Sequence, residues 1–192
     1  WRDPHKPTIK NIEIKTLSKK IKKHNKLLVA KAYKRIPCTK NNKIEDGTAI
    51  ITFSRKDVLY YAELYRKQGF NVSVIYGALS PEIRKIQINR FNNKETDIII
   101  ATDAIGLGVN LPINKIIFSA MQKYDGVSTR DLNQYEIKQI SGRAGRYLST
   151  NSPGLVSLME DIATKNNYEK IKVGLNSYRE YPSLIYFSPT LE

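Results

Sequence analysis

The segment of residues 139–146, with the sequence QISGRAGR, carries two arginines three positions apart. We predict a helix over residues 134–147, and at about 100° per residue Gln139, Arg143 and Arg146 would share one face of it. Two neighbouring guanidinium groups repel each other unless an anion lies between them, and their planar geometry suits phosphate. The segment therefore indicates a phosphate contact. The alternative is a solvated helix face on which the arginines are incidental.

A second segment, residues 101–112 with the sequence ATDAIGLGVNLP, begins where a predicted buried strand ends. In open α/β sheets, ligands bind at the carboxyl ends of the strands. The Thr102 hydroxyl and the amides of residues 106–108 could bind a phosphate there, and the Asp103 carboxylate could accept a hydrogen bond from a ribose hydroxyl. The Gly-x-Gly pair lacks the third glycine of a dinucleotide fingerprint, so a plain connecting loop is an equally open reading.

The charge of the chain favours polyanionic partners. Lys and Arg total 32 against 18 Asp and Glu, which gives a formal net charge of +14 over 192 residues. Hydrophobic residues make up 41%, which is ordinary for a globular protein, and no apolar run approaches the roughly 18 residues that span a membrane. One cysteine and two histidines are too few for a zinc site. We therefore expect a basic globular domain without metal, disulfides or a membrane partner.

Short apolar strands alternate with helical stretches from residue 46 onward, which is the pattern of a parallel sheet with right-handed crossovers. Ser54 and Asp57 have capping-box spacing, and Ser80 followed by Pro81 is a typical helix start. The predicted strands are residues 48–53, 72–76, 97–101, 115–119 and 154–159. The predicted helices end near residues 69, 91, 147 and 173, and residues 121–133 are polar and rich in turns. The expected fold class is α/β with a mainly parallel sheet.

Taken together, residues 48–146 resemble the second RecA-like domain of superfamily 2 helicases, most closely that of the Suv3-type ATP-dependent RNA helicases. Four segments carry the resemblance in family order and spacing: residues 49–57 (AIITFSRKD) as motif IV, 74–84 (VIYGALSPEIR) as motif IVa, 101–111 as motif V and 139–146 as motif VI. The upstream segment YKRIP, residues 33–37, is also similar to Suv3-like proteins. The resemblance implies a RecA-like three-layer αβα sandwich.

The resemblance also assigns roles to residues. Arg146 would be the arginine finger that reaches the γ-phosphate of ATP held by a preceding RecA domain, and Arg143 would be a second catalytic phosphate contact. Gln139 would contact the nucleotide, while Asp103 and Gly106 would couple the nucleotide to the strand-binding face. The expected contacts to the phosphates of single-stranded RNA are Ser54, Arg55, Gly77, Arg84 and Thr102.

The sequence is expected to provide only half of an ATPase site. It contains no Gly-x-x-x-x-Gly-Lys-Ser/Thr motif and no acidic pair of the Walker B type, so nothing in it is predicted to cradle the β-phosphate or hold Mg²⁺. We expect ATP with Mg²⁺ as cofactors, both held mainly by the missing first RecA domain, and no ATPase activity in the isolated chain. The expected organisation is an N-terminal arm or linker at residues 1–45, the second RecA-like domain at 46–175, and a C-terminal tail at 176–192.

Two other functions stay open at this point: a non-catalytic nucleic-acid-binding module with a RecA-like fold, and a DNA helicase domain, because phosphate contacts distinguish RNA from DNA poorly. The expected partners are single-stranded or partly duplex RNA and the first RecA domain of the same chain. The resemblance adds an exoribonuclease as a candidate partner. Because the single cysteine rules out an internal disulfide framework, we expect an intracellular protein, cytoplasmic if bacterial and mitochondrial if eukaryotic.

Overall fold

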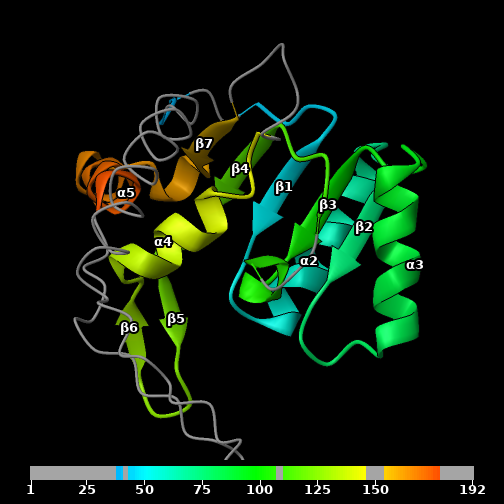
Figure 1. Ribbon diagram of the computed structural model, residues 1–192, viewed down its shortest axis with the longest axis horizontal. Helices are drawn as coiled ribbons and strands as arrows, with labels where there is room; N and C mark the ends of the chain where they lie inside the picture. The colour runs from blue at the N-terminus through cyan, green and yellow to red at the C-terminus, as the bar shows by residue number, and fades with distance from the viewer. Residues whose placement is uncertain (1–37, 41–42, 107–109, 146–153, 178–192) are drawn as a thin grey trace, which may run out of the picture. The chain divides into compact units, whose positions relative to one another are not determined.

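A five-stranded parallel sheet forms the centre of the domain (Figure 1). The computed structural model describes residues 38–40, 43–106, 110–145 and 154–177. The strands lie in the order β2-β3-β1-β4-β7, and every pair of neighbours is parallel. Their bounds are β1 (Thr48–Ile51), β2 (Val72–Ile75), β3 (Ile98–Ala101), β4 (Lys115–Phe118) and β7 (Leu155–Leu158). Each strand falls inside a predicted strand range, so the predicted parallel sheet is confirmed.

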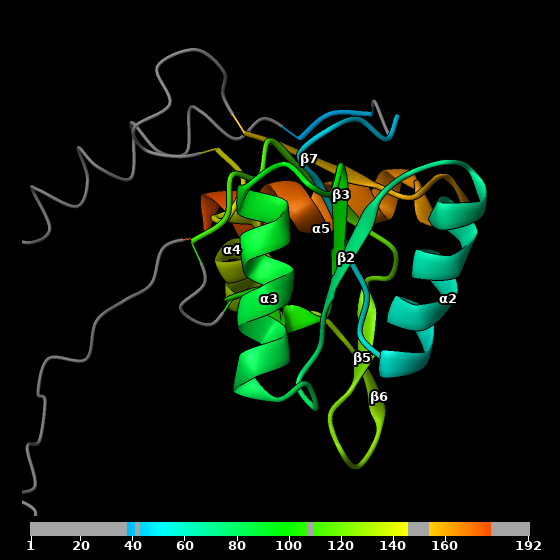
Figure 2. The same cartoon turned by 90° about the vertical axis from the view of Figure 1, so that its right-hand side faces the viewer.

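Helices cover both faces of the sheet. Helix α2 (Arg55–Lys67) packs on one face, and Figure 2 shows it across the sheet from α3 (Pro81–Asn92), α4 (Gln134–Ser141) and α5 (Lys165–Asn176). The strands have apolar side chains on both faces because both are covered: within β1, Ile50 joins the α2 core while its neighbours join the opposite core. The structure is therefore the three-layer αβα sandwich that the sequence predicted.

Polar caps set the start of each helix. Ser54 precedes α2 and its hydroxyl accepts a hydrogen bond from the Asp57 amide at 3.0 Å. Ser80 caps α3 in the same way, with Pro81 in the first turn. Both predicted helix starts are confirmed. Because Ser54 follows β1 almost directly, the cap also fixes the first turn of α2 at the carboxyl end of the sheet.

The polar stretch of residues 121–133, for which the sequence predicts turns, forms a hairpin. Strands β5 (Gln122–Tyr124) and β6 (Thr129–Asp131) pair antiparallel, and Lys123 lies opposite Arg130. The Asp125 carboxylate closes the turn by accepting hydrogen bonds from the backbone amides of Val127 and Ser128, both at 3.0 Å. In Figure 1 the hairpin extends beyond α4, away from the five-stranded sheet.

The predicted helix over residues 134–147 is too long, and this prediction was wrong. Helix α4 ends at Ser141 with Gly142 as its C-cap, so Gln139 and Arg143 do not share a helical face. After Ser141, the amides of Arg143 and Ala144 donate to carbonyl oxygens three residues earlier instead of four, which ends the α-helical pattern. Gly145 then adopts a left-handed φ of 75°, and its amide donates to the Ile113 carbonyl oxygen at 2.9 Å. Arg146 lies outside the described residues.

Candidate nucleic-acid and nucleotide interface

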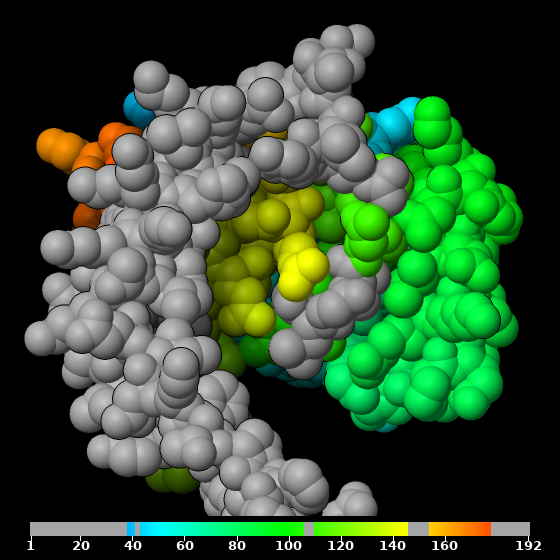
Figure 3. Space-filling view, in the orientation of Figure 1, coloured from blue at the N-terminus to red at the C-terminus, as the bar shows by residue number. Residues whose placement is uncertain are grey.

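A cleft of about 470 Å³ opens at the carboxyl ends of β1, β2 and β3. The loops that follow these strands form its floor, and the hairpin and α4 form one wall. Figure 3 shows the surfaces of α4 in yellow and of α3 in green on one face of the molecule. The cleft is lined by Phe53, Ser54, Arg55, Tyr76, Gly77, Ala78, Thr102, Asp103, Ala104, Lys123, Glu136, Gln139 and Ile140.

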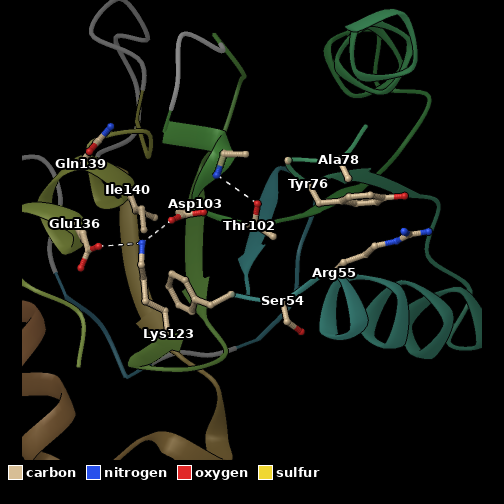
Figure 4. Close-up of a pocket in the computed structure, with 13 residues that line it drawn as sticks. Ser54, Arg55, Tyr76, Ala78, Thr102, Asp103, Lys123, Glu136, Gln139 and Ile140 are labelled. Carbon is tan, nitrogen blue, oxygen red and sulfur yellow. Dashed lines mark hydrogen bonds and ion pairs between the residues drawn. The ribbon is translucent and has the colours of Figure 1, made fainter. Parts of the chain in front are cut away.

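The α2 side of the cleft is basic. Arg55, the first residue of α2, places its guanidinium 5.4 Å from the centre of the Tyr76 ring, so a cation–π contact orients this exposed charge (Figure 4). The first amides of a helix have no intrahelical acceptor and lie at the positive end of the helix dipole. Arg55 and the uncapped first amides of α2 can therefore bind an anion, beside the Asp57 carboxylate, which accepts a hydrogen bond from the Ser54 hydroxyl at 2.7 Å.

The turn after β2 leaves room for a ligand. Gly77 is exposed, and a Cβ atom added to it would meet no atom within 4 Å. Its carbonyl oxygen accepts a hydrogen bond from Arg84 Nη2 at 3.2 Å, so Arg84 supports the turn from α3 and does not itself line the cleft. On the next loop, the Thr102 hydroxyl oxygen accepts from the Ala104 amide at 3.3 Å.

An ion-pair network holds the opposite wall. Lys123 Nζ lies 2.8 Å from Asp103 Oδ2 and 3.0 Å from Glu136 Oε1, so one ammonium group joins the hairpin, the loop after β3 and α4 (Figure 4). Arg130 binds the Glu136 carboxylate with two hydrogen bonds, at 2.8 and 2.9 Å. Glu136 also accepts from the Asn133 amide at 2.9 Å, which completes the capping box of α4.

These contacts change the proton affinity of the two central groups. Hydrogen bonds from Arg130, then from the Asn133 amide and Lys123, lower the pKa of Glu136 from 4.5 to about 2, although burial acts in the opposite direction. The hydrogen bond to Asp103, with Glu136 contributing, raises the pKa of Lys123 above its ordinary value. Both groups are therefore ionised at neutral pH.

The structure brings together some of the predicted site residues and not others. The cleft contains Ser54, Arg55, Gly77, Thr102, Asp103 and Gln139. Gly106 ends the short 3₁₀ helix η1 (Asp103–Gly106). Arg143 is half-buried in the turn after α4 and does not line the cleft. Arg84 lies behind the Gly77 turn, as described above.

Lys123, Glu136 and Tyr76 line the cleft but were not selected from the sequence. Lys123 and Glu136 come from the hairpin and the start of α4. The sequence signal for the hairpin that carries Lys123 is the Asp125-Gly126 pair, a common hairpin turn, between two short polar segments. The sequence signal for Glu136 is its spacing from Asn133, which matches a capping box.

Neither a metal cluster nor a membrane helix is found in the part of the chain that the structure describes. There, no three or more His, Cys, Asp or Glu side chains gather in a way that could bind a metal ion. None of the helices in these same residues has the length and apolar character needed to cross a bilayer.

The fold matches solved domains of the RecA-like class. The C-terminal domain of the DEAD-box protein Dbp5 aligns with a TM-score of 0.56 and 16% identity, covering 80% of this chain and 79% of that domain. The RecA-like fold that the sequence predicted is therefore confirmed. At this identity the likeness concerns the fold alone.

Sequence comparison identifies the family. The model of the helicase conserved C-terminal domain matches residues 19–148, and the chain belongs to this family. The mitochondrial DExH-box ATP-dependent RNA helicase DExH16 of Arabidopsis thaliana is 46% identical over 133 residues, 67% of this chain and 23% of that protein. The mitochondrial ATP-dependent RNA helicase SUV3 of Candida albicans is 41% identical over 142 residues, 72% of this chain and 19% of that protein. The chain thus spans about a fifth of the length of these relatives, and its predicted resemblance to Suv3-type helicases is confirmed.

Proposed function

We propose that this chain is the second RecA-like domain of an ATP-dependent RNA helicase, in which it binds part of a single RNA strand and completes the ATP site of a preceding domain. The carrying observation is the cleft, which collects residues of motifs IV, IVa, V and VI at one edge of the sheet. The relatives are named ATP-dependent RNA helicases, which supports ATP as the nucleotide that is hydrolysed and RNA as the substrate.

The RNA contact follows the basic side of the cleft. Arg55 binds one phosphate, the first amides of α2 and the Ser54 hydroxyl hold the same or the next one, and the open Gly77 turn admits the backbone. Thr102 extends this path on the loop after β3, and Arg84 acts by holding the Gly77 carbonyl. Phosphate contacts of this kind tolerate any base sequence.

The proposed ATP contacts come from motifs V and VI. Arg146 acts as the arginine finger, Arg143 as a second phosphate contact, and Gln139, Asp103 and Gly106 link the nucleotide to the strand. Mg²⁺ and the β-phosphate are held mainly by the first RecA domain. In this proposal, the chain by itself does not hydrolyse ATP, and its domain spans residues 46–175 between an arm at 1–45 and a tail at 176–192.

The RNA contact is tested with the chain of 192 residues and a fluorescent single-stranded oligouridine. Anisotropy titrations compare wild type with Arg55→Ala and with Lys56→Ala, an exposed neighbour that does not line the cleft. The proposal predicts a loss of about tenfold in affinity for Arg55→Ala and less than about twofold for Lys56→Ala. Equal losses in the two variants would contradict a contact through the cleft.

The ATPase activity of the longer protein separates the alternatives, because phosphate contacts alone bind RNA and DNA similarly. A DNA helicase domain would support ATPase activity that DNA stimulates at least as well as RNA, whereas the proposal predicts stronger stimulation by RNA. A non-catalytic binding module would bind RNA and lack any role for Arg146 in ATP hydrolysis. The relatives named above are mitochondrial, and we expect the same compartment if the source is eukaryotic and the cytoplasm if it is bacterial. An exoribonuclease stays a candidate partner.

A further inference from the structure

The strands of the β5–β6 hairpin are held in place mainly by charged contacts. Its strands have the sequences QKY and TRD, without an aliphatic side chain, and in each strand only the central residue is half-buried. A two-stranded hairpin is marginally stable by itself in water. Met121 and Leu132, which flank the two strands, are buried in the core and fix the base of the hairpin. Beyond that base, the central residues Lys123 and Arg130 fix its position through the groups that they contact.

The two cations face a shared carboxylate. Lys123 and Arg130 are opposite each other in the antiparallel register, which places their side chains on the same face of the hairpin. Like charges in such a position repel, and Glu136 removes the repulsion by pairing with both. Glu136 is itself fixed, because its carboxylate closes the capping box of α4 with Asn133. The hairpin is therefore attached to a rigid helix start.

Lys123 differs from Arg130 in reaching a second element. Its ammonium group also contacts Asp103, the first residue of η1, at 2.8 Å, whereas the second carboxylate of Arg130 is Asp125 in the turn of the hairpin itself, at 3.4 Å. Lys123 is 18% exposed and Asp103 is 47% exposed, so the pair lies at the cleft surface with its ammonium largely shielded from water. A movement of the hairpin therefore acts on the loop after β3 through this side chain.

We propose that Lys123 is a positioning residue that couples the β5–β6 hairpin to the loop of Asp103 at the cleft. When a ligand binds to or leaves the cleft, the loop and the hairpin move together because the Lys123 ammonium group contacts both. The coupling itself follows from the contacts above, and its consequence for RNA rests on the proposed function.

Hydrogen exchange of the 192-residue chain without ligand tests the coupling. The amides of Ala104 and Ile105, which donate to the Thr102 hydroxyl and carbonyl oxygens, report on the loop, and those of β5 and β6 report on the hairpin. The matched control is Lys170→Met, which removes an ion pair between α5 and Asp131 of β6 and leaves Asp103 paired. Lys123→Met is expected to speed exchange at both the hairpin and the loop by about three- to tenfold.

Lys170→Met is expected to affect the hairpin alone, and Lys123→Arg, which keeps the charge, is expected to keep loop exchange close to wild type. Unchanged loop amides in Lys123→Met, or equal acceleration of these amides in Lys170→Met, would overturn the proposal. This comparison needs no ligand and stands even if the chain does not bind RNA.

A second comparison adds single-stranded oligouridine. In wild type, RNA is expected to slow exchange of both the loop and the hairpin amides, and in Lys123→Met it is expected to slow the loop alone. Equal slowing of the hairpin in the two proteins would overturn the coupling. Failure of wild type to bind oligouridine would contradict the proposed function, and the ligand-free comparison would then decide the role of Lys123.

Discussion

Lys123 and Arg130 lie directly opposite each other in the β5–β6 hairpin and both pair with Glu136, at 3.0 and 2.8 Å. This single carboxylate joins the hairpin to the capped start of α4. Through Lys123 it also joins both to Asp103, which lines the cleft. The wall of the cleft is thus fixed by charge pairing, while its floor is fixed by the parallel sheet.

The stability of the domain should depend on the ionisation of Glu136. Its pKa is about 2 in the folded chain, below the ordinary 4.5, so its contribution is complete above pH 4.5 and is lost as the pH falls toward 2. Glu136→Gln is expected to lower the free energy of unfolding at pH 7 by about 1–2 kcal/mol, since water partly screens the network. Denaturant unfolding between pH 7 and pH 2 measures this change.

The control for this prediction is Glu63→Gln. Glu63 also has a lowered pKa, because of its hydrogen bond to Lys67, but both side chains of this pair are exposed on α2. We expect a smaller effect from this exposed pair. The difference in stability between wild type and Glu136→Gln should shrink as the pH falls from 4.5 to 2. A constant difference over that range would contradict the assignment.

Substitution of the two serine caps separates an effect on stability from an effect on RNA binding. Ser54→Ala and Ser80→Ala each remove the side chain that accepts a backbone hydrogen bond at a helix start, and each is expected to cost about 1 kcal/mol of unfolding free energy. Ser54 lines the cleft and Ser80 does not. Oligouridine affinity should therefore fall for Ser54→Ala alone. Equal affinities for the two variants would remove the Ser54 hydroxyl from the RNA contact.

The same substitution at two glycines should have opposite effects. A Cβ atom at Gly174 would lie 2.7 Å from Ile137 Cγ2, where α5 packs against α4, so Gly174→Ala is expected to destabilise the domain by about 1–3 kcal/mol. At Gly77 the added methyl group meets no atom within 4 Å. Gly77→Ala should keep the melting temperature and weaken oligouridine binding. An unchanged melting temperature for Gly174→Ala would contradict the close packing of these helices.

Much of the fold could be predicted from the sequence because local signals agree with the buried pattern. The run of isoleucines in β3 marks a strand covered on both faces, and Ser54 and Ser80 mark the helix starts. The motif residues that follow β1, β2 and β3 could be placed in one cleft because the carboxyl ends of parallel strands lie at one edge.

The rest of the site depends on contacts between distant residues. The helix predicted over residues 134–147 includes the glycines at positions 142 and 145, but the amide of Gly145 donates to the Ile113 carbonyl oxygen, a long-range contact that helical periodicity does not contain. In the same way, the pairing of Lys123 with Asp103 joins residues 20 positions apart. Charge alone did not distinguish Lys123 from the other lysines of a strongly basic chain.

The most direct test of the proposed function is the RNA-stimulated ATPase activity of the longer protein that carries this domain. Wild type is compared with Arg146→Ala and with Arg90→Ala, an arginine of α3 that pairs with Glu95 and does not line the cleft. The account predicts that Arg146→Ala loses at least about a hundredfold in turnover at saturating RNA while its RNA affinity is kept, and that Arg90→Ala is unaffected. Full turnover in Arg146→Ala, or no ATPase activity in wild type, would contradict the proposed function.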